Sequence, residues 1–207
     1  MTGPCDCRAR RLCDVLFAGL GLVVLAPVVL VVAVAVLVAL GRPVLFRQTR
    51  AGRHGCEFVI LKFRTLRPPA HPGEPDRDRR TRLGELLRWT SLDELPQLVN
   101  VLKGDMSVIG PRPTLPEQVR HYTPRQRGRL AVRPGMTGWA QVCGRNSLSW
   151  PERIELDLWY LERRCWRLDL LIVLRTVGLL LRPRGVVGPG GVNQGFGPRE
   201  SEVRGVG

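Results

Sequence analysis

The stretch Val15–Gly41 reads VLFAGLGLVVLAPVVLVVAVAVLVALG and carries no formally charged residue over 27 positions. As one straight helix it would be about 40 Å long, against about 30 Å of hydrocarbon in a bilayer. An apolar run of about 18 residues or more is typical of a membrane-embedded segment, which argues strongly against a purely soluble protein. A secretory signal peptide is also disfavoured, because its apolar region usually spans about 7–15 residues.

Pro27 lies near the middle of this stretch and predicts a break, since its ring removes one backbone hydrogen bond and clashes with the carbonyl of Val23. Arginines flank both ends: Arg8, Arg10 and Arg11 before it, and Arg42, Arg47, Arg50 and Arg53 after it. A single span would place one basic flank outside the cell, against the positive-inside tendency. We therefore expect a re-entrant helix hairpin over residues 15–41 that follows a basic cytoplasmic N-terminus, residues 1–14. A single-pass anchor with a tolerated proline is the alternative.

The 207-residue chain contains 32 lysines and arginines against 18 aspartates and glutamates, a formal charge of +14. This charge would also suit a membrane-tethered basic protein that binds acidic ligands without catalysis. We expect no nucleic-acid partner, because the sequence has no recognisable nucleic-acid-binding module and no interleaving of aromatic and basic residues. The six cysteines and three histidines do not complete a zinc-binding spacing.

Residues 42–181 read as a small catalytic domain of mixed α/β class, mostly helical. Apolar runs on either side of Gly52–Gly55 predict a strand–turn–strand unit. Helices are predicted over 83–87, 95–102, 123–130, 151–166 and 168–181, and 134–146 is predicted as a loop with a short strand. The helix at 168–181 suits the core or the membrane interface. Residues 182–207, which are rich in glycine, are predicted to form a disordered tail.

Asp93 and Glu94 are adjacent carboxylates just before a predicted helix start. The unpaired amides of a helix N-terminus favour an ionised carboxylate and also favour bound phosphate. A structural interpretation competes with a catalytic one, because Ser91-x-x-Glu94 fits a capping box. The residues alone leave both interpretations open.

Six stretches, in order along the chain, resemble one protein family. They are RPVLFRQ (42–48), LKFRT (61–65), TSLDELPQL (90–98), GDMSVIGPRP (104–113), RPGMTGWAQ (133–141) and GRNS (144–147). Together they resemble the bacterial sugar transferases, that is, the monotopic polyprenyl-phosphate phosphoglycosyl transferases in their small catalytic-unit form. The resemblance runs from about Arg11 to Leu181. Members usually carry Ser where this chain has Ala26, and commonly Asn where it has Cys143.

The resemblance implies an enzyme that moves a sugar-1-phosphate from a nucleotide diphosphate sugar, usually a UDP-sugar, to a polyprenyl phosphate such as undecaprenyl phosphate. UMP would leave, and the product would start a membrane-linked glycan for exopolysaccharide, capsule, O-antigen or glycoprotein. It also implies a re-entrant membrane helix over 15–41 and contact with membrane lipid. The catalytic domain would face the cytoplasm at the bacterial inner membrane, and oligomers would be compatible with this arrangement.

The same resemblance assigns roles to individual residues. Asp93 would be the nucleophile and Glu94 a Mg²⁺ ligand. Cations that would contact substrate phosphates are Lys62, Arg64, Arg112 and Arg145. Asp157 would contribute to substrate binding, although a salt bridge with Arg153 or Arg163 on the same helix is the alternative.

Overall fold

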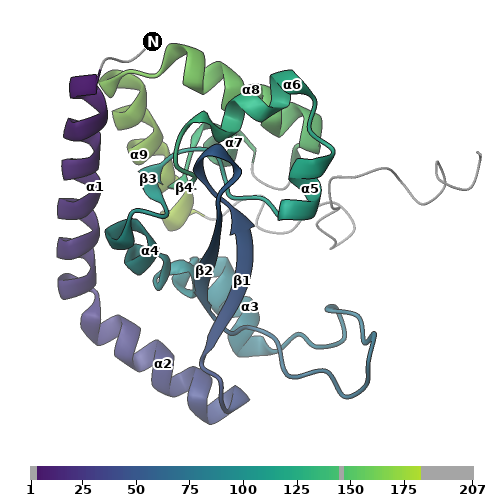
Figure 1. Ribbon diagram of the computed structural model, residues 1–207. Coiled ribbons are helices and arrows are strands. Elements are labelled where there is room, and N and C mark those ends of the chain that lie inside the picture. The colour runs from purple at the N-terminus through teal and green to yellow at the C-terminus, as the bar shows by residue number, and fades with distance from the viewer. Residues whose placement is uncertain (1–3, 145–146, 183–207) are drawn as a thin grey trace, which may run out of the picture.

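The computed structural model describes residues 4–144 and 147–182 and confirms a mixed, mostly helical α/β fold (Figure 1). The helices are α1 (Pro4–Val24), α2 (Ala26–Leu40), α3 (Arg82–Thr90), α4 (Gln97–Lys103), α5 (Pro116–Arg120), α6 (Pro124–Arg127), α7 (Trp139–Cys143), α8 (Trp150–Arg163) and α9 (Trp166–Leu181). The strands are β1 (Leu45–Ala51), β2 (Glu57–Phe63), β3 (Ser107–Ile109) and β4 (Gly135–Thr137). Three 3₁₀ turns are η1 (Arg53–Gly55), η2 (Leu92–Glu94) and η3 (Gly128–Ala131). The predicted tail falls almost entirely on residues 183–207, outside the described part.

Helices α1 and α2 form a bent pair along one side of the molecule (Figure 1). Among the described residues, no single helix is long and apolar enough to cross a membrane, whereas Arg8–Val24 and Ala26–Leu40 meet that test together, with a bend of 63°. The break falls at Leu25, two residues before Pro27. Pro27 occupies the first turn of α2, where a missing backbone N–H costs no helical hydrogen bond. The predicted break is therefore confirmed, with a small shift in position.

Helix α1 starts at Pro4, so the basic residues before Val15 continue the same helix instead of forming a separate segment. The reason is tertiary packing. Arg10 and Asp14 are each 7% exposed and face the rest of the protein. The polar start of α1 is thus part of the folded body.

The predicted strand–turn–strand unit is confirmed as the antiparallel pair β1–β2, with Leu45 opposite Phe63 and Ala51 opposite Glu57. Gly55 turns the chain with a φ of 80°, which favours glycine. Ile60 packs on α1 and α4 in one core cluster with Ala18, Leu98, Val101 and Met106. A second cluster, formed by Val32, Val36, Phe63 and Leu87, joins α2 to β2 and α3.

Segment 134–146 differs from the prediction of a loop with a short strand. The strand is present as β4, parallel to β3, but Trp139–Cys143 forms the additional helix α7. Five residues are too few to show a helical period, and the helix is stabilised by contacts from elsewhere. Trp139 stacks on Trp159 of α8, with 5.2 Å between ring centroids.

Candidate active site

Asp93 and Glu94 lie in η2, between α3 and α4. Ser91 has a φ of 59° and its side chain makes no capping hydrogen bond, so the capping-box interpretation is wrong. In that left-handed conformation Ser91 ends α3 instead of capping the next turn. The Glu94 carboxylate is therefore available for other partners.

Two of the predicted cations hold Glu94. Lys62 Nζ lies 2.6 Å and Arg112 Nη2 lies 2.8 Å from the same oxygen, Oε1. Burial alone would raise the pKa of Glu94, but the charges and hydrogen bonds of Arg112 and Lys62 outweigh it and hold the pKa well below the ordinary value. Glu94 is thus ionised, and Oε2 takes part in neither bond.

The neighbouring Asp93 is 8% exposed. Burial and then the Glu94 carboxylate raise the pKa of Asp93 to about 6, against the opposing charges of Lys62, Arg112 and Arg88. At neutral pH the carboxylate is mostly ionised, yet water solvates it poorly. A poorly solvated carboxylate beside fixed cations is suited to attack an anionic phosphorus centre.

Arg112 is positioned by a buried ion pair that the sequence did not indicate. Arg129 donates to the Arg112 carbonyl at 3.1 Å and to Asp157 Oδ2 at 2.6 Å, and its other Nη donates to the Tyr122 hydroxyl at 2.6 Å. Burial opposes the charge on Arg129, but Asp157 and Tyr122 outweigh it and raise the pKa of Arg129. No local pattern singles out Arg129 among 30 arginines, so only its contacts reveal it.

Asp157 was expected either to bind substrate or to pair with Arg153 or Arg163, and the structure supports neither. Its side chain is 1% exposed and pairs with Arg129, 28 residues earlier in the chain. A fully buried carboxylate lacks the surface that a substrate contact needs. Asp157 instead contacts Arg129, which also donates to the Arg112 carbonyl.

Arg64, a third predicted cation, does not join the cluster around Glu94. Arg64 donates to the carbonyls of Leu40, Gly41 and Arg42, and so satisfies the C-terminal end of α2. A cation there is favoured by the negative end of the helix dipole. This is a structural role instead of the predicted phosphate contact. Arg145 lies outside the described residues.

The predicted metal ligand Glu94 has one carboxylate oxygen that could hold a Mg²⁺ ion. Among residues 4–144 and 147–182, no group of three or more His, Cys, Asp or Glu side chains is arranged to hold a metal ion. Mg²⁺ commonly takes one or two carboxylates and completes its coordination with water and substrate phosphates. Glu94 matches a site with one protein carboxylate, because its Oε2 is bound by neither Lys62 nor Arg112.

Comparison with known proteins identifies the family of this chain. The family model described as "Bacterial sugar transferase" matches residues 6–183. The sugar transferase EpsL of Bacillus subtilis is 44% identical over 181 residues, which cover 86% of this chain and 89% of the relative. The UDP-glucose:undecaprenyl-phosphate glucose-1-phosphate transferase of Caulobacter vibrioides is 44% identical over 83% of this chain and 69% of its own length.

A third relative is the undecaprenyl-phosphate galactose phosphotransferase of Salmonella typhimurium. It is 38% identical over 70% of this chain, a match that covers 35% of the relative's length. The family model covers most of this chain, and the EpsL match covers most of both proteins. This protein belongs to the bacterial sugar transferase family.

Proposed function

We propose that this protein transfers a sugar-1-phosphate from a UDP-sugar to a polyprenyl phosphate, with undecaprenyl phosphate as the acceptor and UMP as the leaving group. The observation that carries the proposal is the buried Asp93 carboxylate beside Glu94. Lys62 and Arg112 both contact the Glu94 carboxylate. The Caulobacter and Salmonella relatives are named for sugar-phosphate transfer to undecaprenyl phosphate, which supports the acceptor and the type of reaction. Those names specify glucose and galactose, so we leave the sugar open. The product would begin a membrane-linked glycan.

The proposed reaction is a double displacement at phosphorus. An Asp93 carboxylate oxygen forms a bond to the sugar-bearing phosphorus, and the bond from that phosphorus to the UMP oxygen breaks. An oxygen of the polyprenyl phosphate then attacks the aspartyl phosphosugar and frees the carboxylate. The first attack needs no deprotonation at neutral pH, and the water-soluble donor and the lipid acceptor need not be bound together.

Arg112 and Lys62 would offset the negative charge of the donor diphosphate and orient it against Asp93. Glu94 would hold Mg²⁺ through Oε2 while its Oε1 keeps both cations in place. A bound Mg²⁺ stabilises the charge that develops on the departing phosphate. We do not extend the phosphate role to Arg64, because it caps α2.

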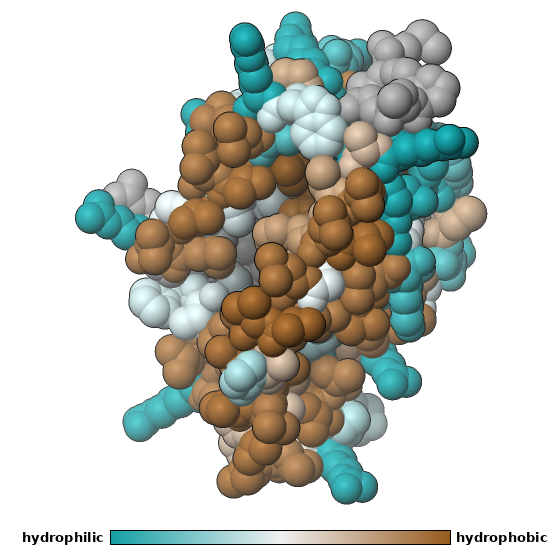
Figure 2. Space-filling model, turned by 90° about the vertical axis from the view of Figure 1, so that its left-hand side faces the viewer, coloured by the Kyte–Doolittle hydropathy of each residue, from teal (hydrophilic) through white to brown (hydrophobic). Residues whose placement is uncertain are grey.

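We further propose that α1 and α2 enter and leave the bacterial inner membrane on the cytoplasmic side. Figure 2 shows apolar side chains spread over the face that these two helices form. On this pair Leu20, Val23, Val31 and Val38 are 67%, 74%, 68% and 81% exposed. Helix α9 adds an exposed apolar side with Leu170, Leu174 and Leu181, while its Asp169 and Ile172 are buried. Apolar surface of this extent is typical of a lipid contact.

Labelling with an impermeant thiol reagent tests this topology. In a cysteine-free background, single cysteines near Thr2 and at exposed Thr49 should both stay unlabelled in intact cells and react once the membrane is opened. A cysteine near Thr2 that reacts in intact cells would contradict the hairpin and favour the single-pass alternative.

The activity itself is tested with a panel of UDP-sugars in a reconstituted membrane. We expect UMP release to depend on one sugar, to occur once per enzyme without acceptor, and to turn over when undecaprenyl phosphate is added. Chelation of divalent cations should abolish release and Mg²⁺ should restore it. A basic binding protein without catalysis, the alternative function, would release no UMP from any of these donors.

A further inference from the structure

We infer that Asp14, at the middle of α1, is a positioning residue that fixes strand β3 and, through it, Arg112. The inference rests on the proposed role of Arg112 in holding the donor phosphates. It assigns the membrane hairpin a function beyond anchoring, because the same helix that carries the apolar face also sets the geometry of the active site.

The contact between α1 and β3 is direct and buried. Asp14 Oδ1 accepts a hydrogen bond from the Val108 backbone N–H at 2.8 Å and another from Ser107 Oγ at 3.0 Å. Asp14 is 7% exposed and Ser107 is 6% exposed. Both bonds end on one oxygen, so β3 requires an acceptor at that point and not a negative charge. A buried N–H that lost this acceptor would bear a desolvation cost.

The chain from Val108 to Arg112 has little freedom to adjust independently. Gly110 donates to the Thr137 carbonyl at 2.9 Å, and Gly135 donates to the Pro111 carbonyl at 2.9 Å. A Cβ on Gly110 would lie 2.6 Å from the Arg133 carbonyl oxygen, so the two backbones are in close contact. Because β4 also pairs with β3, a displacement of β3 that moves β4 with it would be passed to Arg112.

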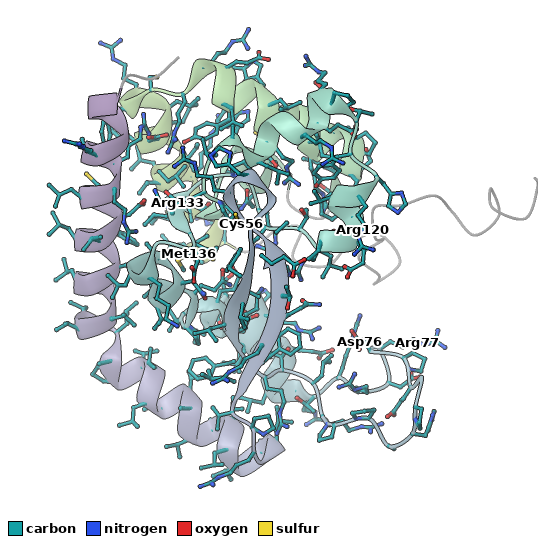
Figure 3. All side chains as sticks on the ribbon, in the orientation of Figure 1. Cys56, Asp76, Arg77, Arg120, Arg133 and Met136 are labelled. Carbon is teal, nitrogen blue, oxygen red and sulfur yellow. The ribbon has the colours of Figure 1, made fainter. Side chains whose placement is uncertain are left out.

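Helix α1 is itself held firmly against the domain. Arg11 donates to the carbonyls of Val101 and Leu102 at 2.6 and 2.8 Å, and Arg10 pairs with the buried Asp169 of α9. In Figure 1, α1 runs beside β3 and α4, and Figure 3 places Arg133 and Met136 between α1 and the β1–β2 hairpin. Helix α1 is thus held in place, so that its Asp14 can hold β3.

The test uses the full-length protein in lipid nanodiscs, with UDP as the binding probe and UMP release as the activity. Asp14→Ala should weaken UDP binding and raise the donor KM by about 10-fold or more, since misplacing a catalytic group by about 1 Å costs up to about 100-fold. Asp14→Asn keeps an oxygen acceptor at Oδ1 and should stay within about threefold of the wild type. Ser107→Ala removes one of the two bonds and should give a smaller loss, which provides a milder variant if Asp14→Ala does not fold.

Arg11→Ala is the matched control, because it removes two hydrogen bonds between α1 and the domain without touching β3. It should lower the melting temperature and cost much less UDP affinity than Asp14→Ala, because Arg10 and Asp14 still hold α1. A double-mutant cycle with Arg112→Gln then measures whether Asp14 affects UDP binding through Arg112. If Asp14 acts through Arg112, Asp14→Ala should cost no further UDP affinity in the Arg112→Gln background.

Three results would overturn the inference: equal loss of UDP affinity from Asp14→Ala in both backgrounds, wild-type affinity in both Asp14→Ala and Ser107→Ala, or a loss in Arg11→Ala as large as that in Asp14→Ala. Failure of the proposed function looks different. In that case the wild type would bind UDP and release no UMP from any UDP-sugar, and the binding cycle would still decide the role of Asp14.

Discussion

Replacing Asp93 with asparagine should lower the rate of UMP release from the UDP-sugar by about three orders of magnitude or more, even when no acceptor is present. The amide keeps the shape of the side chain and loses the oxygen charge that would attack phosphorus. Intact-protein mass spectrometry of the wild type with donor alone should show a mass gain of one sugar phosphate, and the Asp93→Asn variant should show none.

Glu94→Gln is the matched control, because it alters the adjacent carboxylate and spares the nucleophile. This variant should still form the covalent adduct, more slowly and with a weaker dependence on Mg²⁺. Turnover of Asp93→Asn at a rate near that of the wild type would show that the nucleophile, and the covalent route that depends on it, are wrongly assigned.

Replacing Arg129 with methionine should lower the free energy of unfolding by about 3–5 kcal/mol, because it leaves the Asp157 carboxylate buried without its partner. The pair is 2% and 1% exposed, with 2.6 Å between Nη2 and Oδ2. Chemical unfolding in detergent micelles measures the change. The variant should also bind UDP more weakly, since the Arg112 carbonyl loses its donor.

Arg125→Met provides the comparison for this effect. Arg125 pairs at 2.8 Å with Glu155, which lies in α8 like Asp157. Both side chains of this pair are more than half exposed. Exposed pairs contribute little to stability, so this variant should unfold like the wild type. The double variant Arg129→Met with Asp157→Leu should recover much of the lost stability, because it removes both buried charges together. Equal stability of Arg129→Met and Arg125→Met would contradict the assignment.

The sequence predicted several local features of this fold correctly. The apolar run with a central proline predicted two helices with a break, and the break lies two residues from Pro27. The apolar runs on either side of Gly52–Gly55 predicted the β1–β2 pair. Each of these depends on constraints that a few neighbouring residues impose on their own backbone.

The candidate site was only partly predictable. The resemblance correctly grouped Asp93, Glu94, Lys62 and Arg112, which the structure brings together. It placed Arg64 among the phosphate ligands, whereas this side chain caps α2. It placed Asp157 at the substrate, whereas this carboxylate is buried with Arg129. Arginine carries the same charge and donors in all these roles, so its type does not reveal which role it takes.

The sequence by itself determined that the chain has a broken pair of apolar helices, a glycine-turned strand pair and two adjacent carboxylates before a helix. Only the tertiary structure decided what those carboxylates contact, because the partners of Glu94 lie 32 and 18 residues away. It also decided that α1 holds β3 through Asp14, over 94 residues of sequence. Backbone preferences are local and can be read along the chain, whereas a side-chain pair between distant segments forms only where packing brings both segments to one place and excludes water.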